Sequence, residues 1–166
     1  LREGVPAERI ECIGNIMIDS YEMMRGAIEA DGTRSGLGLA PQDYGVVTLH
    51  RPSNVDTREA LAPLVEALLT VSQRVPLVFA VHPRTRKKLQ EFALMERLSG
   101  SGAVRVVDPL GYIQFMNLVT GARVVITDSG GVQEETTYLG IPCLTLRENT
   151  ERPVTVTEGS NRLVAP

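Results

Sequence analysis

The sequence lacks several features that would assign it to a class at once. It has only two cysteines, Cys12 and Cys143, and each lies in an apolar, strand-like run, so we expect reduced, buried thiols. No apolar run approaches the roughly 20 residues that span a bilayer. No signal peptide is visible in this chain, which begins at Leu1. The net charge of −3 gives no electrostatic reason to expect a nucleic acid or a membrane as partner. These absences favour a cytoplasmic protein.

Three nucleotide-binding and metal-binding signatures are also missing. The first main strand is not followed by GxGxxG, GxxxxGK[ST] is absent, and no His, Cys and Asp residues stand at the spacing of a metal site. The sequence therefore disfavours a classical dehydrogenase, a P-loop NTPase and a zinc enzyme. We expect neither a cofactor nor a metal.

The pattern that is present alternates strands and helices. With 166 residues, 43% of them apolar, the chain can build one compact domain. The strands read as near-continuous apolar runs, which is typical of a parallel sheet covered on both faces. The sequence therefore predicts a doubly wound, Rossmann-like α/β fold, with the usual strand order if the strand at 44–49 is the first. Strands are expected at 9–13, 44–49, 77–81, 104–107, 123–126, 142–146 and 162–164, helices at 16–30, 57–74, 84–98, 111–120 and 132–139, and a loop at 31–43.

Polar residues follow the expected main strands at their carboxyl ends, where open α/β sheets bind ligands. Both histidines of the chain belong to this set, with His50 after the first main strand and His82 after the second. Each also has a structural reading, because His50 could be a loop or capping residue and His82 could cap the helix that follows. Arg51 could be a solvated charge, and Phe115 could belong to the core.

The segment 127–135, Thr-Asp-Ser-Gly-Gly-Val-Gln-Glu-Glu, carries the most information. It joins a β-branched strand to a helix through small residues, which leaves backbone N–H groups open at the positive end of a helix dipole. That arrangement binds phosphate. The alternative is that Ser129 is only an N-cap and the glycines only a turn.

Four blocks of the sequence resemble the non-hydrolysing UDP-N-acetylglucosamine 2-epimerases, in order and over essentially the whole chain. Gly14-Asn15 resembles the point where that family crosses into its second domain. The resemblance implies the C-terminal half of a GT-B fold, with residues 1–19 leading in from an N-terminal domain and 20–166 forming a UDP-binding domain that lacks a final helix. The blocks are Val-Thr-Leu-His-Arg-Pro-Ser-Asn-Val-Asp at 47–56, Asp-Pro-Leu-Gly-Tyr-Ile-Gln-Phe at 108–115, the segment 127–135, and the loop 146–153.

The activity that the resemblance implies is interconversion of UDP-GlcNAc and UDP-ManNAc, through elimination of UDP and its re-addition. His50 would be the catalytic residue beside the diphosphate. Ser129, Gly130 and Gly131 would bind phosphate, and Arg152 would approach the UDP moiety.

The remaining roles also come from the resemblance. Glu135 would hold the ribose hydroxyls, while the Leu110 backbone and Phe115 would flank the uracil. Arg51 and His82 match positions that contact a second, allosteric UDP-GlcNAc in some members. The resemblance further implies a homodimer in the full-length protein.

Two departures from the family pattern bear on activity. Ser53 stands where many members have Glu, and the acidic residues that handle the C2 proton belong to the N-terminal half. We therefore expect the chain alone not to epimerise. The alternatives are a GT-B glycosyltransferase, a hydrolysing 2-epimerase and a non-catalytic nucleotide-sugar binding module.

Overall fold

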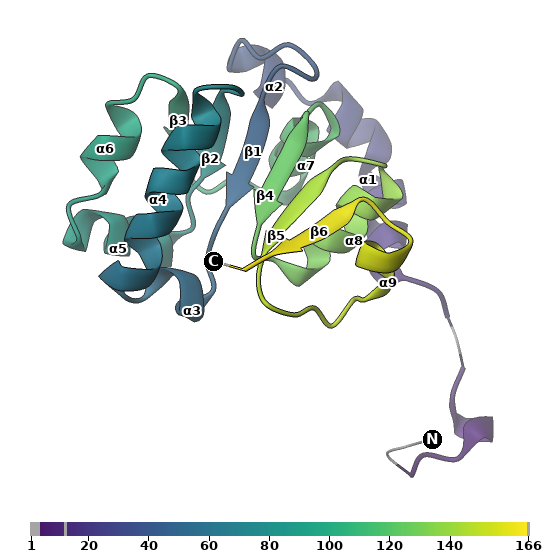
Figure 1. Ribbon diagram of the computed structural model, residues 1–166. Coiled ribbons are helices and arrows are strands. Elements are labelled where there is room, and N and C mark those ends of the chain that lie inside the picture. The colour runs from purple at the N-terminus through teal and green to yellow at the C-terminus, as the bar shows by residue number, and fades with distance from the viewer. Residues whose placement is uncertain (1–3, 12, 166) are drawn as a thin grey trace.

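The computed structural model describes residues 4–11 and 13–165, which form a parallel sheet between two layers of helices (Figure 1). The order of the strands is β3-β2-β1-β4-β5-β6, which confirms the predicted Rossmann arrangement. Every neighbouring pair in the sheet is parallel. The strands are β1 (Gly45–Thr48), β2 (Leu77–Ala80), β3 (Val104–Val107), β4 (Val124–Thr127), β5 (Cys143–Leu146) and β6 (Asn161–Val164).

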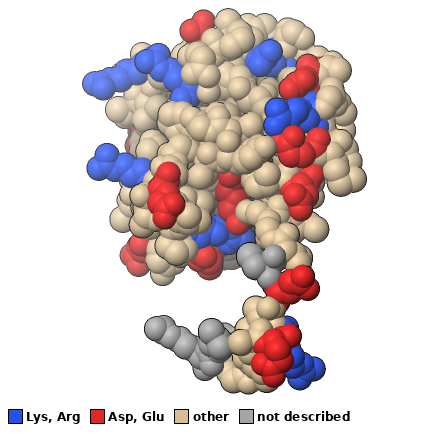
Figure 2. Space-filling model, turned by 90° about the vertical axis from the view of Figure 1, so that its right-hand side faces the viewer, with Lys and Arg blue, Asp and Glu red and all other residues tan. Residues whose placement is uncertain are grey.

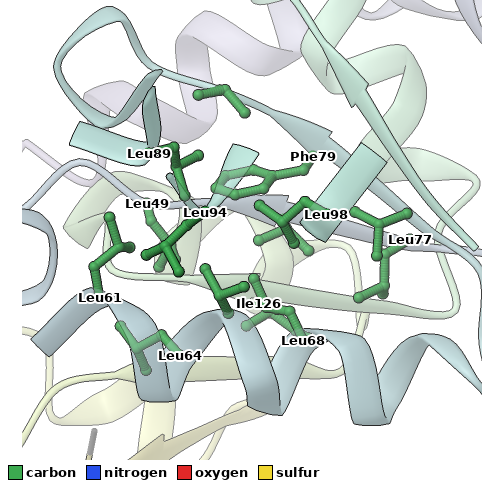
Figure 3. Packing of buried hydrophobic residues seen from close by; sticks show 14 of the residues in the cluster. Leu49, Leu61, Leu64, Leu68, Leu77, Phe79, Leu89, Leu94, Leu98 and Ile126 are labelled. Carbon is green, nitrogen blue, oxygen red and sulfur yellow. The ribbon is translucent and has the colours of Figure 1, made fainter. Parts of the chain in front are cut away.

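The helices divide into two groups because alternate strand residues point to opposite faces of the sheet. Val47, Phe79 and Ile126 pack under α4 to α6 (Figure 3), whereas Val46 and Val125 pack under α1, α7 and α8. The helices, with the 3-10 turn η1 (Ala7–Arg9), are α1 (Ile16–Ala30), α2 (Thr33–Gly36), α3 (Pro52–Val55), α4 (Arg58–Ser72), α5 (Pro83–Glu91), α6 (Met95–Ser99), α7 (Tyr112–Thr120), α8 (Gly130–Tyr138) and α9 (Val154–Thr157).

The strand predicted at 9–13 is wrong for the residues that the structure describes. Ile10 and Ile13 are 53% and 78% exposed, and the chain there runs away from the sheet (Figure 1). An extended segment needs a neighbouring strand for its N–H and C=O groups, and both edges of this sheet, β3 and β6, lie elsewhere. Cys12 lies outside the described residues. Cys143 is buried in β5, as predicted.

The helix predicted at 84–98 is also wrong, because it is two helices. Ala93 takes a left-handed conformation, with φ of 56°. The Leu94 N–H donates to the Leu89 carbonyl at 2.8 Å, and the Ala93 N–H donates to that of Gln90 at 3.1 Å. This is a Schellman motif, in which glycine is the usual left-handed residue. Since alanine is a strong helix former, the sequence gives no sign of the break.

Three short helices were not predicted: α2, which lies inside the predicted loop, α3 and α9. Each is four residues long, which is too short for a hydrophobic repeat to be recognised. Among the described residues, no helix combines the length and apolar character that crossing a bilayer would require. On the face of the molecule shown in Figure 2, basic and acidic side chains are interspersed.

Gly45 lets the central strand β1 fit between its neighbours. A Cβ atom at this position would lie 2.8 Å from Leu77 Cδ2 and 3.2 Å from Val124 Cγ1. We expect Gly45→Ala to lower the free energy of unfolding by about 1–3 kcal/mol, as overpacking does. Gly26→Ala is the control, because a Cβ in the middle of α1 meets open space. It should raise stability by about 0.5–1 kcal/mol. Urea unfolding of both variants checks this, and a Gly45→Ala variant as stable as the parent would contradict it.

Candidate nucleotide-sugar site

The candidate site lies where the chain reverses its direction of travel across the sheet. From β1 the chain moves outward to β2 and β3, and it then returns to β4 on the other side of β1. The loops after β1, β2, β3 and β4 therefore meet at one edge, which is where doubly wound sheets bind ligands. They enclose a cavity of about 200 Å³. Its lining residues are Thr48, His50, Ala80, His82, Pro109, Leu110, Phe115, Ser129 and Val132.

Asp128 fastens the loop after β1 to the end of β4. Its carboxylate is fully buried and accepts hydrogen bonds from the backbone N–H groups of His50 and Arg51, at 3.0 and 2.9 Å. The side-chain amide of Asn54 adds a third at 3.2 Å. The imidazole Nδ1 of His50 lies 2.9 Å from Asp128 Oδ1. A buried charge with this many donors is well compensated.

The same contacts raise the pKa of His50 and lower the pKa of Asp128. The hydrogen bond to Asp128 raises the pKa of His50, despite opposing effects of burial and of the Arg51 charge. Burial raises the pKa of Asp128, but the hydrogen bonds from His50 and Arg51 outweigh it and leave that pKa below its ordinary value. The geometry therefore favours a charged carboxylate beside an imidazole that holds its proton to higher pH.

The first turn of α8 forms one wall of the site. Ser129 is the N-cap residue, and its side chain makes no capping hydrogen bond, so its hydroxyl remains available to the cavity that it lines. Its backbone N–H is already used, since it donates to Thr127 Oγ1 at 3.0 Å. Gly130 allows the Arg152 guanidinium to approach, because a Cβ there would lie 3.0 Å from Arg152 Nη1. A positive side chain thus joins the positive end of the helix dipole.

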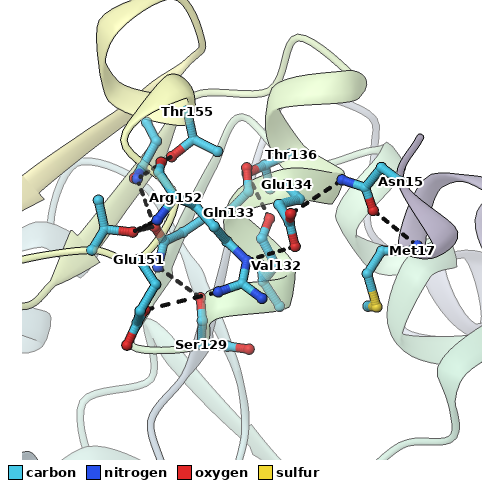
Figure 4. Close-up of polar contacts among 12 residues, drawn as sticks. Asn15, Met17, Ser129, Val132, Gln133, Glu134, Thr136, Glu151, Arg152 and Thr155 are labelled. Atoms are coloured by element: carbon cyan, nitrogen blue, oxygen red, sulfur yellow. Dashed lines mark hydrogen bonds and ion pairs between the residues drawn. The ribbon is translucent and has the colours of Figure 1, made fainter. Parts of the chain in front are cut away.

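Arg152 is held in place by a short chain of polar contacts that runs through Glu134 to Asn15 (Figure 4). Its Nε lies 2.6 Å from Glu134 Oε2, and the Asn15 side-chain amide donates to Glu134 Oε1 at 3.1 Å. Asn15 also caps α1 through Met17. Glu134 therefore links the start of α1 to the arginine that lies against Gly130 at the start of α8.

Glu135 follows Glu134 in α8 and is 3% exposed. The Tyr112 hydroxyl donates to its Oε1 at 2.8 Å. Burial raises the pKa of Glu135, and the negative charge of Glu134 adds to this, while the bond from Tyr112 opposes it.

The structure brings five of the ten predicted site residues to one cavity. His50, His82, Leu110, Phe115 and Ser129 line the one cavity. Gly130, Gly131, Glu135 and Arg152 follow along α8 or lie over its first turn.

Arg51 and His82, which were paired in the allosteric prediction, lie in different pockets. Arg51 donates to the Asp128 carbonyl at 3.0 Å and lines a second, polar pocket of about 400 Å³ beside Arg147. His82 also caps α5, since its Nδ1 accepts from the Arg84 N–H at 3.2 Å, so its structural reading is confirmed alongside its place in the first cavity.

The segment 127–135 that sequence reasoning singled out contains Asp128 and Glu134, but the sequence did not predict the contacts of Asp128 with His50 and of Glu134 with Arg152. The available signal for Asp128 was a carboxylate directly after a buried strand and immediately before the Ser-Gly-Gly turn. Within residues 4–11 and 13–165, no three His, Cys, Asp or Glu side chains gather in a way that could hold a metal ion.

The family model described as UDP-N-acetylglucosamine 2-epimerase matches residues 1–166. The chain belongs to this family. The UDP-N-acetylglucosamine 2-epimerase of Methanocaldococcus jannaschii is 39% identical over 169 residues, covering 99% of this chain and 46% of the relative. The Pseudomonas aeruginosa UDP-2,3-diacetamido-2,3-dideoxy-D-glucuronate 2-epimerase is 40% identical over 160 residues, covering 95% and 42%. The chain thus spans about half the length of these relatives.

Solved epimerase structures have the same fold. The crystal structure of the M. jannaschii UDP-GlcNAc 2-epimerase in complex with UDP-GlcNAc and UDP superposes with a TM-score of 0.90 at 39% identity, covering 99% of this chain and 46% of that one. The Neisseria meningitidis enzyme bound to UDP-GlcNAc gives 0.81 at 26% identity, covering 99% and 45%. These neighbours are GT-B enzymes, so this epimerase-family chain has the fold of one GT-B half.

Glu135 offers a test of the site by its pH dependence. Its folded-state pKa lies above that of the unfolded chain, so its contribution to stability falls as the pH rises through the interval between the two values. Glu135→Gln removes this charge and keeps an acceptor for Tyr112. We expect the variant to gain stability relative to the parent as the pH rises above about 4.5, the ordinary pKa of a glutamate, as measured by urea unfolding. The same substitution at the exposed Glu158 is the control, and parallel profiles for parent and Glu135→Gln would contradict the assignment.

Proposed function

We propose that this chain is the UDP-binding half of a UDP-GlcNAc 2-epimerase, which interconverts UDP-GlcNAc and UDP-ManNAc. The observation that carries the proposal is the convergence of His50 and Ser129 on one cavity at the switch point of the sheet. It is supported by the likeness to an enzyme crystallised with UDP-GlcNAc and UDP. In this proposal residues 1–19 lead in from an N-terminal domain and residues 20–166 bind UDP.

The proposed reaction begins with loss of the C2 proton and cleavage of the bond between C1 and the diphosphate oxygen. It passes through a 2-acetamidoglucal and UDP. UDP then adds back at C1 while C2 takes up a proton on its opposite face, which inverts the configuration at C2. Negative charge grows on the diphosphate as it departs. A positive or hydrogen-bonding group placed there stabilises this charge.

Each named side chain has a role in that step. His50 lies beside the diphosphate and stabilises or protonates it, which suits an imidazole whose pKa is raised by Asp128. The Ser129 hydroxyl, the Gly130 and Gly131 backbone and Arg152 bind phosphate at the start of α8.

The nucleoside is held further along the same wall. Glu135 accepts hydrogen bonds from the ribose hydroxyls, and the Leu110 backbone and Phe115 flank the uracil. Arg51 and His82 would contact a second, regulatory UDP-GlcNAc, which would have to extend from the cavity that His82 lines to the second pocket that Arg51 lines.

A modified sugar is the second candidate substrate. The P. aeruginosa relative, at 40% identity, is named for a UDP-2,3-diacetamido uronate. Such a sugar shares the UDP and the 2-acetamido group, so the residues of this half would bind both in the same way. We further propose a homodimeric, cytoplasmic protein whose product enters polysaccharide synthesis.

Binding of UDP tests the phosphate site. Titration calorimetry of the chain with UDP should give measurable affinity, and Arg152→Ala and Ser129→Ala should each weaken it about tenfold or more. A charge-assisted hydrogen bond contributes roughly 1.5–3 kcal/mol, and 1.4 kcal/mol is a factor of ten. Arg123→Ala, at the amino end of β4, is the control and should bind UDP like the parent. Equal affinity for UDP in all three variants would contradict the assignment of Arg152 and Ser129 to the phosphate site.

Turnover tests the division of labour between the two halves. We expect the 166-residue chain to bind UDP without converting UDP-GlcNAc. A protein that also carries the N-terminal half should produce UDP-ManNAc, and His50→Ala should lower its kcat at least a hundredfold, the scale of acid–base assistance. Product analysis separates UDP-ManNAc from free ManNAc or a glycosylated acceptor. Turnover by the 166-residue chain, or free ManNAc as the product, would contradict the proposal.

A further inference from the structure

Both histidines of the cavity are held through Nδ1. The partner of His50 is a hydrogen-bond acceptor, whereas the partner of His82 is a hydrogen-bond donor. His50 Nδ1 faces the Asp128 carboxylate at 2.9 Å, whereas His82 Nδ1 accepts a hydrogen bond from the Arg84 N–H at 3.2 Å. A carboxylate only accepts hydrogen bonds, so His50 Nδ1 must carry a proton. By the same reasoning, His82 Nδ1 carries none, and its Nε2 is protonated.

Asp128 cannot turn away from His50. Its Oδ2 accepts from the N–H groups of His50 and Arg51 and from the Asn54 amide, while Oδ1 faces the imidazole. The side chain is fully buried. Because two of these donors belong to the backbone of the loop that carries His50, one carboxylate fixes both the loop and the ring.

We propose that Asp128 is a positioning residue for His50, which keeps the proton on Nδ1 and leaves Nε2 as the free ring nitrogen on the cavity side. The neighbouring His82 then presents an Nε2–H donor, with the two ring centroids 5.8 Å apart. In its neutral form the cavity offers a substrate one imidazole acceptor and one imidazole donor. When His50 is protonated, the carboxylate stabilises the imidazolium, whose Nε2–H points to the same space.

The effect of Asp128 on catalysis rests on the proposed function. The tautomer of His50 follows from the contact with Asp128 alone. The charged or titratable groups around the His50 ring are Asp128 at the end of β4, Arg51 in its own loop and His82 after β2. Of these, only Asp128 is bonded to the ring.

The chain has two histidines, so long-range proton–nitrogen NMR can follow all of its imidazole nitrogens. His82→Gln assigns the signals. Above its titration midpoint, His50 should show the Nδ1–H tautomer and His82 the Nε2–H tautomer. If His50 shows the Nε2–H tautomer, the proposal is overturned, and this measurement needs no substitution of Asp128.

Asp128→Asn removes the acceptor charge, and the titration midpoint of His50 should then move to lower pH. In a protein that carries both halves, kcat should fall at least tenfold, with a smaller change in KM. Asn54→Ala is the matched control, because Asn54 bonds to Asp128 and to the Leu146 carbonyl but not to the ring. It should loosen the loop and leave the tautomer and midpoint of His50 unchanged. A midpoint that moves equally in both variants would reduce Asp128 to a structural residue.

The two proposals can fail separately. If His50 has the expected tautomer but UDP does not bind, the positioning role stands and the proposed function falls. If UDP binds while His50 shows the other tautomer, the positioning role alone is lost. If Asp128→Asn does not fold, the tautomer of His50 in the parent chain still tests the positioning role.

Discussion

The buried carboxylate of Asp128 is the interaction on which the site depends. It lies at the end of β4, and it binds two backbone N–H groups, an amide and an imidazole from the segment that follows β1. Left without partners, a buried charge would destabilise the fold by several kcal/mol. Here the donors compensate it, and in return they are fixed in space. The loop after β1 is thereby fixed against the end of β4, beside the cavity at the centre of the sheet.

A second chain of contacts joins the site to the start of the domain. Arg152 lies over Gly130 at the N-terminus of α8, held by Glu134, which also binds Asn15 at the cap of α1 (Figure 4). Residues more than one hundred positions apart in the chain thus set the place of one guanidinium. The wall proposed to bind phosphate is therefore not a property of the Ser-Gly-Gly turn alone, because its positive side chain, Arg152, comes from the loop after β5.

The fold was largely predictable, and its exceptions have local physical causes. The inner strands β1, β2 and β4 are apolar runs that the parallel sheet buries on both faces, so pattern and environment agree there. The edge strands β3 and β6 each carry an exposed arginine, Arg105 and Arg162. The segment 9–13 contains three apolar residues, Ile10, Cys12 and Ile13, but its described part has no strand beside it, and pattern alone cannot supply one. Ala93 ends a helix in a conformation that its intrinsic preference opposes. There the packing of Leu94 into the core, where it is 3% exposed, outweighs local propensity.

The sequence by itself determined the alternation of strands and helices and placed His50, His82 and Ser129 after strands whose ends share one edge. The tertiary structure decided which of these side chains meet. It put His82 beside His50 but turned Arg51 into another pocket, and it joined Asp128 to His50 across 78 positions of the chain. The reason is that strand order and parallel register set spatial neighbours, while the direction of each side chain depends on the hydrogen bonds that its neighbours offer.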